Sequence, residues 1–362
     1  PFDLDIQTAH TYIKLNYSTD TSIRSGMELL SINGKPMPEI LADLTRYISA
    51  EKLVDKYEFL EERFRFWLWL IYQWQGPFEV SLKTSSGSTY LVKVPGISFE
   101  ALKVKLNQPK KEKPVYYTYR CIPEVKAGLI DFRSFSDYNQ FKEFLEKTFV
   151  QMKADGAENL IIDIRQNGGG SSSLGDLFLT YLTDKPFDQV SQMDVKASQQ
   201  IKHFYRKFLP WYIRWLPLQW FHPFGRKLWS TPDGGIATWK GEPKKYKTNK
   251  LLFDGDIFLL ISNHTFSSAT MFAATTKDYQ IGILIGEETG GLATSYGDIY
   301  SFDLPNTHIS VGVSYKRFVR PSGQDDGRGV LPDYEVSQTQ QDIITGKDAV
   351  LEFTKQFIKS KR

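Results

Sequence analysis

Residues 256–271 read DIFLLISNHTFSSATM, and this stretch decides the fold that we predict. Its first part, Asp256–Ile261, is an almost wholly apolar run, which is typical of a strand buried on both faces. A polar turn follows, and Ser268–Lys277 has the composition of a helix. Ser267 and Ser268 therefore stand at a helix N-terminus, where unpaired N–H groups and the helix dipole stabilise a developing negative charge.

The flanking sequence continues this alternation of strands and helices. Apolar runs predict strands at 128–132, 159–164 and 281–285, and apolar residues at helical spacing predict helices at 138–153 and 174–182. Such alternation predicts an α/β layer structure. We assign residues 113–362 to one core domain, with an insertion at about 185–250.

The first part of the chain, residues 1–112, has a different pattern. Alternating strands at 11–15, 78–82 and 90–94, and a tight Asn33-Gly34 turn, predict a separate β-rich domain. A segment at about 39–75 has helical spacing and interrupts this domain as an insertion. The lysine-rich stretch 103–113 is interpreted as a linker.

Composition narrows the functional classes. The 362 residues include 45 basic and 42 acidic ones, and a net charge of +3 argues against a nucleic-acid-binding protein. Because Cys121 is the single cysteine, an internal disulfide framework and a cysteine metal cluster are excluded, and we expect no metal or cofactor. No apolar run approaches the ~20 residues of a membrane span. Since the chain begins at Pro1 without methionine, we expect that it has been trimmed, so that any export signal is not visible.

An aromatic segment, residues 203–222, breaks the strand–helix alternation. It combines tryptophans with arginines, a composition that fits either a cover over a substrate cleft or a membrane surface. The prolines Pro210 and Pro217 interrupt any long helix. We expect a partly buried lid, with a membrane contact or a dimer contact as the alternatives.

A glycine-rich loop gives the serines a possible partner. Asp163–Ser173 reads DIRQNGGGSSS after a predicted buried strand. Its glycines allow backbone N–H groups to approach a ligand, but the Lys-Ser/Thr of a P-loop is absent. We therefore interpret Ser267 as a nucleophile, with an oxyanion hole built from the Ser268 N–H and from Gly168 or Gly169. The alternative is that Ser267 merely caps the helix.

Four motifs resemble one family, the C-terminal (tail-specific) processing peptidases and the tricorn core protease. The motifs are LIIDIRQNGGG at 160–170, TFSSA at 265–269, ILIGEETGG at 283–291 and GVLPD at 329–333. The resemblance implies a ClpP/crotonase-like α/β core and a serine peptidase whose nucleophile is Ser267. In addition, GMELLSING at 26–34 resembles the core of a PDZ module, which implies a PDZ-like N-terminal domain.

The sequence offers several candidates for the general base. Leu292 stands where the processing peptidases have their lysine, and Thr270 where they have a glutamate. Asp131 stands where the tricorn branch has its histidine, and Asp326 fits an acid of that branch. The candidate bases are therefore Asp131, which matches by position, and His264, whose ordinary pKa suits the role.

A third candidate base, His308, begins a predicted strand. We hypothesise a serine endopeptidase that acts on protein or peptide tails, with the substrate strand paired to a sheet edge. The alternative is a peptide-binding member of the same fold that lacks the base. An acyl-CoA enzyme of the crotonase type is a third reading. Because the family is usually exported, we expect an extracytoplasmic location, in the periplasm, in the cell envelope or secreted.

Overall fold

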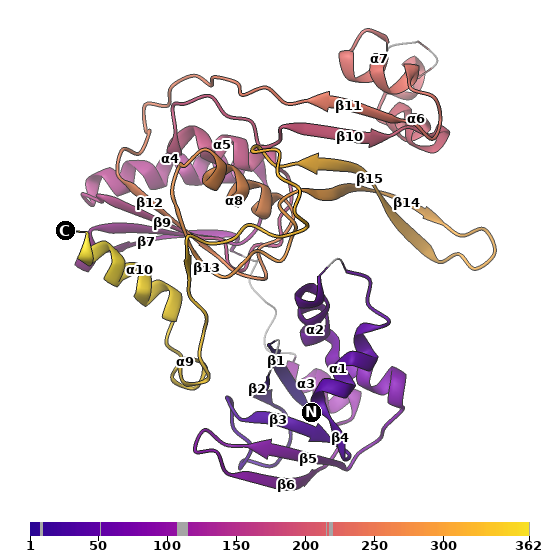
Figure 1. Cartoon of the computed structure of the whole chain (residues 1–362), viewed down its shortest axis with the longest axis vertical. Coiled ribbons are helices and arrows are strands. Elements are labelled where there is room, and N and C mark those ends of the chain that lie inside the picture. Colours follow the sequence, from indigo (N-terminus) through magenta and orange to yellow (C-terminus); the bar gives the residue numbers. More distant parts are fainter. Residues whose placement is uncertain (8–9, 51, 107–114, 215, 217–219, 362) are drawn as a thin grey trace.

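The computed structural model describes residues 1–7, 10–50, 52–106, 115–214, 216 and 220–361 (Figure 1). In the N-terminal part, antiparallel strands form a sheet in the order β1-β2-β3-β5-β6, with β4 against β3. These strands are β1 (Phe2–Ile6), β2 (Thr11–Asn16), β3 (Glu28–Ile32), β4 (Lys35–Pro36), β5 (Phe78–Lys83) and β6 (Thr89–Val94). The predicted tight turn is confirmed, because Asn33 and Gly34 join β3 to β4 with φ angles of 51° and 76°.

Helices enter this part between β4 and β5, as the pattern at 39–75 predicted. They are α1 (Met37–Thr45) and α2 (Leu53–Tyr72), and α3 (Phe99–Leu106) follows the sheet. Ile40, Leu41 and Leu44 of α1 pack into the same core as the strands. The prediction of a linker at 103–113 is wrong for residues 103–106, which belong to α3, and residues 107–113 lie outside the described residues.

The central sheet has the order β16-β13-β12-β9-β8-β7. Its strands are β7 (Tyr117–Ile122), β8 (Ala127–Phe132), β9 (Asn159–Asp163), β12 (Asp256–Ile261), β13 (Ile283–Gly286) and β16 (Tyr334–Glu335). In this sheet β8, β9, β12, β13 and β16 run parallel to one another, and β7 pairs antiparallel with β8. The predicted strands of the core are confirmed.

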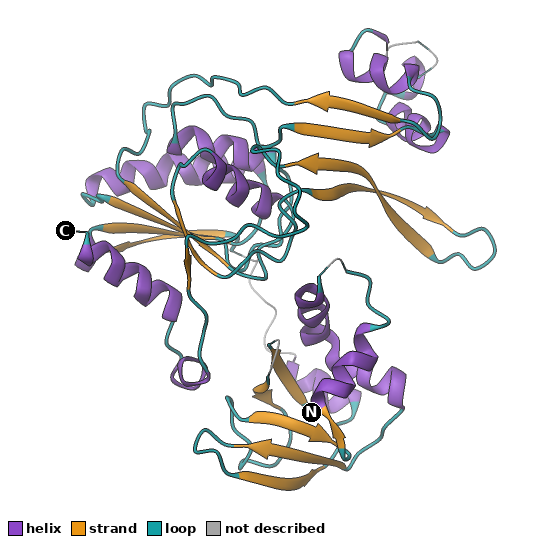
Figure 2. Cartoon of the chain, viewed as in Figure 1, coloured by secondary structure: helices purple, strands orange, loops and turns teal. Residues whose placement is uncertain are grey.

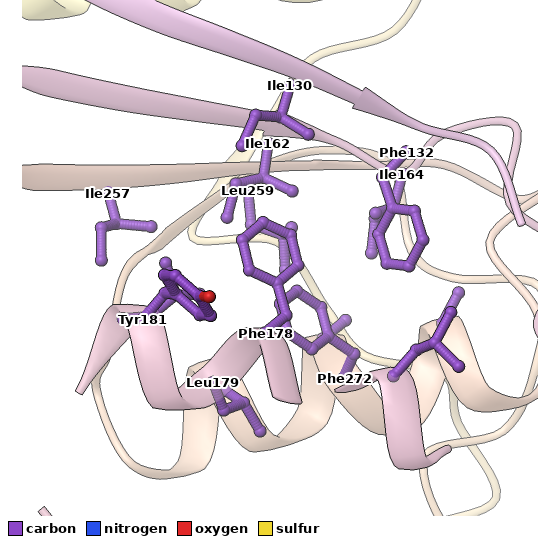
Figure 3. Packing of buried hydrophobic residues seen from close by; sticks show 14 of the residues in the cluster. Ile130, Phe132, Ile162, Ile164, Phe178, Leu179, Tyr181, Ile257, Leu259 and Phe272 are labelled. Carbon is purple, nitrogen blue, oxygen red and sulfur yellow. The ribbon is translucent and has the colours of Figure 1, made fainter. Parts of the chain in front are cut away.

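Helices cover both faces of this sheet (Figure 2). On one face lie α4 (Tyr138–Ala154), α5 (Ser173–Leu182) and α8 (Ser268–Asp278), and on the other lies α10 (Ala349–Ser360). Ile257 and Leu259 of β12 point toward α5 and α8 (Figure 3), whereas Phe258 and Leu260 join the cluster of α10. Successive residues of β12 thus point alternately into two different cores, which explains why β12 is apolar at nearly every position.

A further sheet, in the order β11-β10-β15-β14, was not predicted. It pairs strands of the 185–250 insertion, β10 (Gln192–Lys196) and β11 (Ile236–Lys240), with a long hairpin, β14 (Ser295–Asp303) and β15 (Ser310–Val319). Short elements complete the description, namely η1 (Pro123–Val125), α6 (Gln199–Lys207), η2 (Trp211–Ile213), α7 (Pro223–Ser230) and α9 (Gln340–Thr345). Within the described ranges, no helix combines the length and the apolar character that a membrane span requires.

Candidate active site

The serine turn, residues 262–268, and the glycine loop, residues 164–170, meet at one edge of the central sheet. β9 and β12 are parallel neighbours, with Asp163 opposite Leu260, so the loops that follow them leave the sheet side by side. The Phe266 N–H donates to the carbonyl of Asn167 at 3.0 Å. The predicted convergence of the two motifs therefore follows from strand order.

Buried polar side chains fix the two loops. Asn167, which is fully buried, donates from Nδ2 to the Phe132 carbonyl at 2.8 Å and accepts the Gly169 N–H at 2.9 Å. Thr265, equally buried, donates from Oγ1 to the Ile164 carbonyl at 3.0 Å. Because a buried polar group without a partner costs about 1–3 kcal/mol, these bonds specify one arrangement of the loops.

Ser267 has a backbone conformation that few non-glycine residues adopt, with φ 54° and ψ −123°. Such a conformation costs on the order of 1–3 kcal/mol and persists only where the surroundings impose it. The residue is exposed, and its side chain makes no capping hydrogen bond to α8. Ser267 therefore occupies the N-cap position without capping α8 through its side chain, and it lines a cavity.

Backbone N–H groups next to Ser267 are the candidate oxyanion donors. Ser268 is the first residue of α8, so its N–H has no intrahelical partner, and its own hydroxyl donates to the Gly170 carbonyl at 2.6 Å. Gly169, with φ +96°, lies so close that an added Cβ would stand 2.7 Å from the Cβ of Ser267. The Gly169 N–H already donates to Asn167, which counts against Gly169 as an oxyanion donor. Ser268 and Gly168 remain, and both line the cavity.

The cavity at Ser267 has a volume of about 700 Å³. Its walls come from the serine turn, the glycine loop, α2 and the β14–β15 hairpin. Its titratable carboxylates are those of Asp55, Glu58 and Glu62 on α2 and of Asp298 on β14. In the part of the chain that the structure describes, no histidine, lysine or arginine lines this cavity.

Two predicted bases line a different cavity, of about 760 Å³. There Asp131 accepts a hydrogen bond from Arg133 Nε at 2.8 Å. His264 Nδ1 lies 2.7 Å from Glu58 Oε1. Burial alone would lower the pKa of His264, but the bond with Glu58 and the nearby carboxylates outweigh it and raise that pKa. Neither residue lines the Ser267 cavity, so the structure does not bring them to the hydroxyl.

The other two candidates are also separated from the serine cavity. Asp326 is exposed, and its carboxylate accepts the Arg328 N–H at 3.1 Å. His308 is exposed in the turn between β14 and β15. Neither lines the cavity. Glu58, which sequence reasoning missed, does line it. The helical pattern predicted α2, but only the tertiary structure places carboxylates of α2 in the wall of the serine cavity. Nor do the described residues contain a group of three or more His, Cys, Asp or Glu that could hold a metal ion.

Comparison with known proteins identifies the family. Residues 126–336 match the model of peptidase family S41. The chain belongs to peptidase family S41. This S41 chain is 26% identical to the tail-specific protease of Haemophilus influenzae over 214 residues, which are 57% of the chain and 24% of that relative. It thus spans about a quarter of the curated relative it matches. The family resemblance seen in the sequence is confirmed.

Solved structures agree with the fold. This S41 chain superposes on mature CPAF bound to lactacystin with a TM-score of 0.69 and 17% identity, over 99% of the chain and 82% of CPAF. Mature CPAF in another structure gives a TM-score of 0.66 with 18% identity, over the same shares. At this identity the likeness concerns the fold, a mixed α/β architecture with parallel and antiparallel sheets.

The remaining S41 motifs brace the serine turn. Glu288 and Thr289 accept the backbone N–H groups of Gly329 and Val330, at 2.7 and 2.8 Å, and so tie the 283–291 motif to the 329–333 motif. The Gly291 N–H donates to the Thr265 carbonyl at 3.2 Å. These contacts press the 283–291 loop against the serine turn.

The two positions at which this chain differs from the processing peptidases, Thr270 and Leu292, lie next to the serine turn or in its cavity. Thr270 is buried and donates from Oγ1 to the Thr265 carbonyl at 3.0 Å. Leu292 lines the serine cavity. An apolar side chain thus occupies the place where the resemblance leads one to expect a lysine.

Proposed function

We propose that this S41 chain is a serine endopeptidase that cleaves protein or peptide tails through an acyl-enzyme on Ser267. One observation carries the proposal: Ser267 has a strained backbone conformation at a helix N-terminus, its side chain makes no capping bond, and the residue lines a cavity. Strained residues of this kind cluster at active sites, where the strain presents a side chain to the substrate.

In the proposed reaction, Ser267 Oγ attacks the scissile carbonyl carbon and its proton passes to a base. The backbone N–H groups of Ser268 and Gly168 stabilise the oxyanion as charge develops. The tetrahedral intermediate then breaks down: the amine leaves with the proton that the base took up, and an ester remains on Ser267. Water then hydrolyses this ester. For the base we assign Glu58, which lines the cavity, with His264 as the group that orients its carboxylate at 2.7 Å.

The hairpin supports a peptide as the substrate. β14 is an edge strand, and its residues Ser295–Asp298 line the serine cavity. An edge strand presents unpaired N–H and C=O groups to which an extended peptide can add as a further strand. We further propose that residues 1–112 form a PDZ-like module that captures tails, that the ClpP/crotonase-like core follows from residue 113, and that the protein acts outside the cytoplasm.

A second candidate function is peptide binding without hydrolysis. It is favoured by the apolar side chain of Leu292 in the cavity and by the absence of lysine, arginine and histidine from its described lining. In such a protein the cavity and the edge strand would hold a peptide that Ser267 does not attack. Fold alone does not decide between the two functions.

Covalent labelling separates the candidates. A fluorophosphonate probe should form an adduct on Ser267 that mass spectrometry locates, and Ser267→Ala should abolish both the adduct and peptide cleavage. Ser171→Ala is the matched control, since Ser171 also lines the cavity but should keep full labelling. A folded wild-type chain that takes no label and cleaves no peptide would identify the non-hydrolytic binder.

The base is tested separately. Glu58→Gln should lower cleavage by at least ~10²-fold, the low end for loss of a general base, while Asp131→Asn leaves it unchanged. His264→Ala should lower it less, because His264 acts through Glu58. If Glu58→Gln cleaves like the wild type, the assignment of Glu58 is wrong even though the Ser267 nucleophile stands.

A further inference from the structure

The described residues of the aromatic segment do not form the lid that the sequence favoured. Among the described residues of 195–232, none lines the serine cavity. Its large side chains are instead turned to solvent, with 79% of Trp211, 82% of Phe221 and 70% of Phe208 exposed. Tyr212 and Trp220 are exposed as well. We call these five residues the aromatic cap. Exposed apolar groups gathered in one segment mark an interaction surface.

The charge of this segment has one sign. Between Asp194 and Asp233 the sequence contains basic side chains but no aspartate or glutamate. The basic residues are Lys196, Lys202, Arg206, Lys207, Arg214, Arg226 and Lys227. Because the whole chain carries only +3, this segment is a local positive patch on a chain that is otherwise slightly acidic.

The helices on either side of the aromatic cap, α6 and α7, pack on a small core of their own. Ile201 of α6 and Leu228 of α7 pack with Val195 and Ala237 of β10 and β11. With these positions turned inward, the opposite faces of the helices turn outward. The helices lie at the far end of the β10–β11 ladder, away from the central sheet (Figure 1). The cap is therefore carried by a scaffold that projects from the catalytic core.

Hydrogen bonds fix the turn that bears the exposed rings. Arg214 donates from Nε to the Leu209 carbonyl at 2.7 Å and from Nη2 to the Lys207 carbonyl at 2.8 Å. These bonds hold the carbonyls at the end of α6 and fold η2 back against it. Trp211 and Tyr212, which lie in η2, are thus presented by an ordered turn.

We propose that the aromatic cap and its basic residues dock this protein on the surface of an anionic lipid bilayer. Tryptophan and tyrosine favour the headgroup level, where the ring is apolar and its polar atom stays wet. Exposed Lys207, Arg226 and Lys227 match the negative charge of the lipid phosphates. The charge complementarity selects an anionic bilayer over a neutral one, and the binding is peripheral.

Vesicle flotation tests the proposal with the full chain. The wild type should float with mixed phosphatidylcholine–phosphatidylglycerol vesicles and remain below with pure phosphatidylcholine vesicles, and added salt should weaken its binding. Combining Lys207→Glu, Arg226→Glu and Lys227→Glu should weaken binding by ~100-fold or more, since each basic residue near an anionic surface contributes roughly fivefold. The matched control reverses three exposed α4 lysines, Lys142, Lys147 and Lys153, and should float like the wild type.

A second variant tests the exposed rings of the aromatic cap. Trp211→Ala with Phe221→Ala should reduce flotation at least tenfold, whereas Phe99→Ala, at a ring that is 75% exposed on α3, should not. Equal flotation on neutral and anionic vesicles overturns the proposal. The proposal is also overturned if the wild type does not float but forms a concentration-dependent dimer that is lost in the Trp211→Ala, Phe221→Ala variant. That result would assign the aromatic cap to contact with a second copy of the chain. Binding to heparin beads but to neither vesicle would overturn it as well.

Discussion

The serine turn and the aromatic cap differ in which side chains they bury: the first buries polar side chains, and the second exposes apolar ones. At the serine turn, polar side chains such as Asn167 and Thr265 are fully buried, and each is bonded to the backbone of a neighbouring segment. In the aromatic cap, Trp211 and Phe221 are large and apolar and lie mostly in water. Both arrangements break the usual sorting of side chains by polarity.

The difference shows two ways of building a functional region. The serine turn must hold one geometry to a fraction of an ångström, and buried hydrogen bonds supply that precision because any other arrangement leaves polar groups unpaired. The aromatic cap only has to present a surface, so its exposed rings contribute little to folding. Substitutions should therefore be costly for stability in the first region and nearly free in the second.

The largest effect is expected from Asn167→Ala. It leaves the Phe132 carbonyl and the Gly169 N–H buried without their partner, which should lower the free energy of unfolding by on the order of 4 kcal/mol. Urea denaturation measures this loss. Asn139→Ala, at an exposed position of α4, is the control and should cost nothing, because alanine favours a helix. Equal midpoints for the two variants would refute the view that buried polar bonds hold the serine turn.

An intermediate effect is expected at Glu61 of α2, a half-buried carboxyl group. Burial raises the pKa of Glu61 from 4.5 to about 7, although its carboxylate accepts the Ile6 N–H at 2.6 Å. Well below pH 4.5 the carboxyl is protonated in both states. As the pH rises toward 7 only the unfolded chain loses the proton, so the folded state loses stability over that window.

Glu61→Gln tests this dependence, because glutamine keeps an oxygen acceptor for Ile6 and cannot ionise. Urea denaturation at pH 5 and pH 8 should show the wild type losing about 2 kcal/mol relative to the variant between the two. A constant difference between wild type and variant would mean that Glu61 ionises in the folded chain as readily as in the unfolded one.

The smallest effect is expected in the aromatic cap. Trp211→Ala with Phe221→Ala removes rings that are already in water, so the free energy of unfolding should change by no more than ~0.5 kcal/mol. The same urea titration measures it. A loss of 2 kcal/mol or more would show that these rings pack against the scaffold, and the contrast with the serine turn would disappear.

Local patterns predicted the elements of the core because its strands are buried on both faces and its helices on one. Continuous apolar runs and helical spacing are direct consequences of that burial, as β12 and α4 show. The β14–β15 hairpin and its partners β10 and β11 were not predicted, because their strands are half-buried or exposed at nearly every position and carry no strong apolar pattern. Helices α6 and α7 were not predicted either, because only a few of their residues are buried.

The sequence by itself determined the nucleophile candidate and its surroundings, since a strand, a turn and a helix are local, and parallel neighbouring strands must release their loops at one edge. Ser267, Ser268 and the glycine loop were found in this way. Only the tertiary structure decided which titratable groups line the serine cavity. Packing brought α2 with Glu58 to the cavity and left His264 and Asp131 in another. Proximity between segments far apart in the chain depends on how whole layers pack, and no local pattern encodes it.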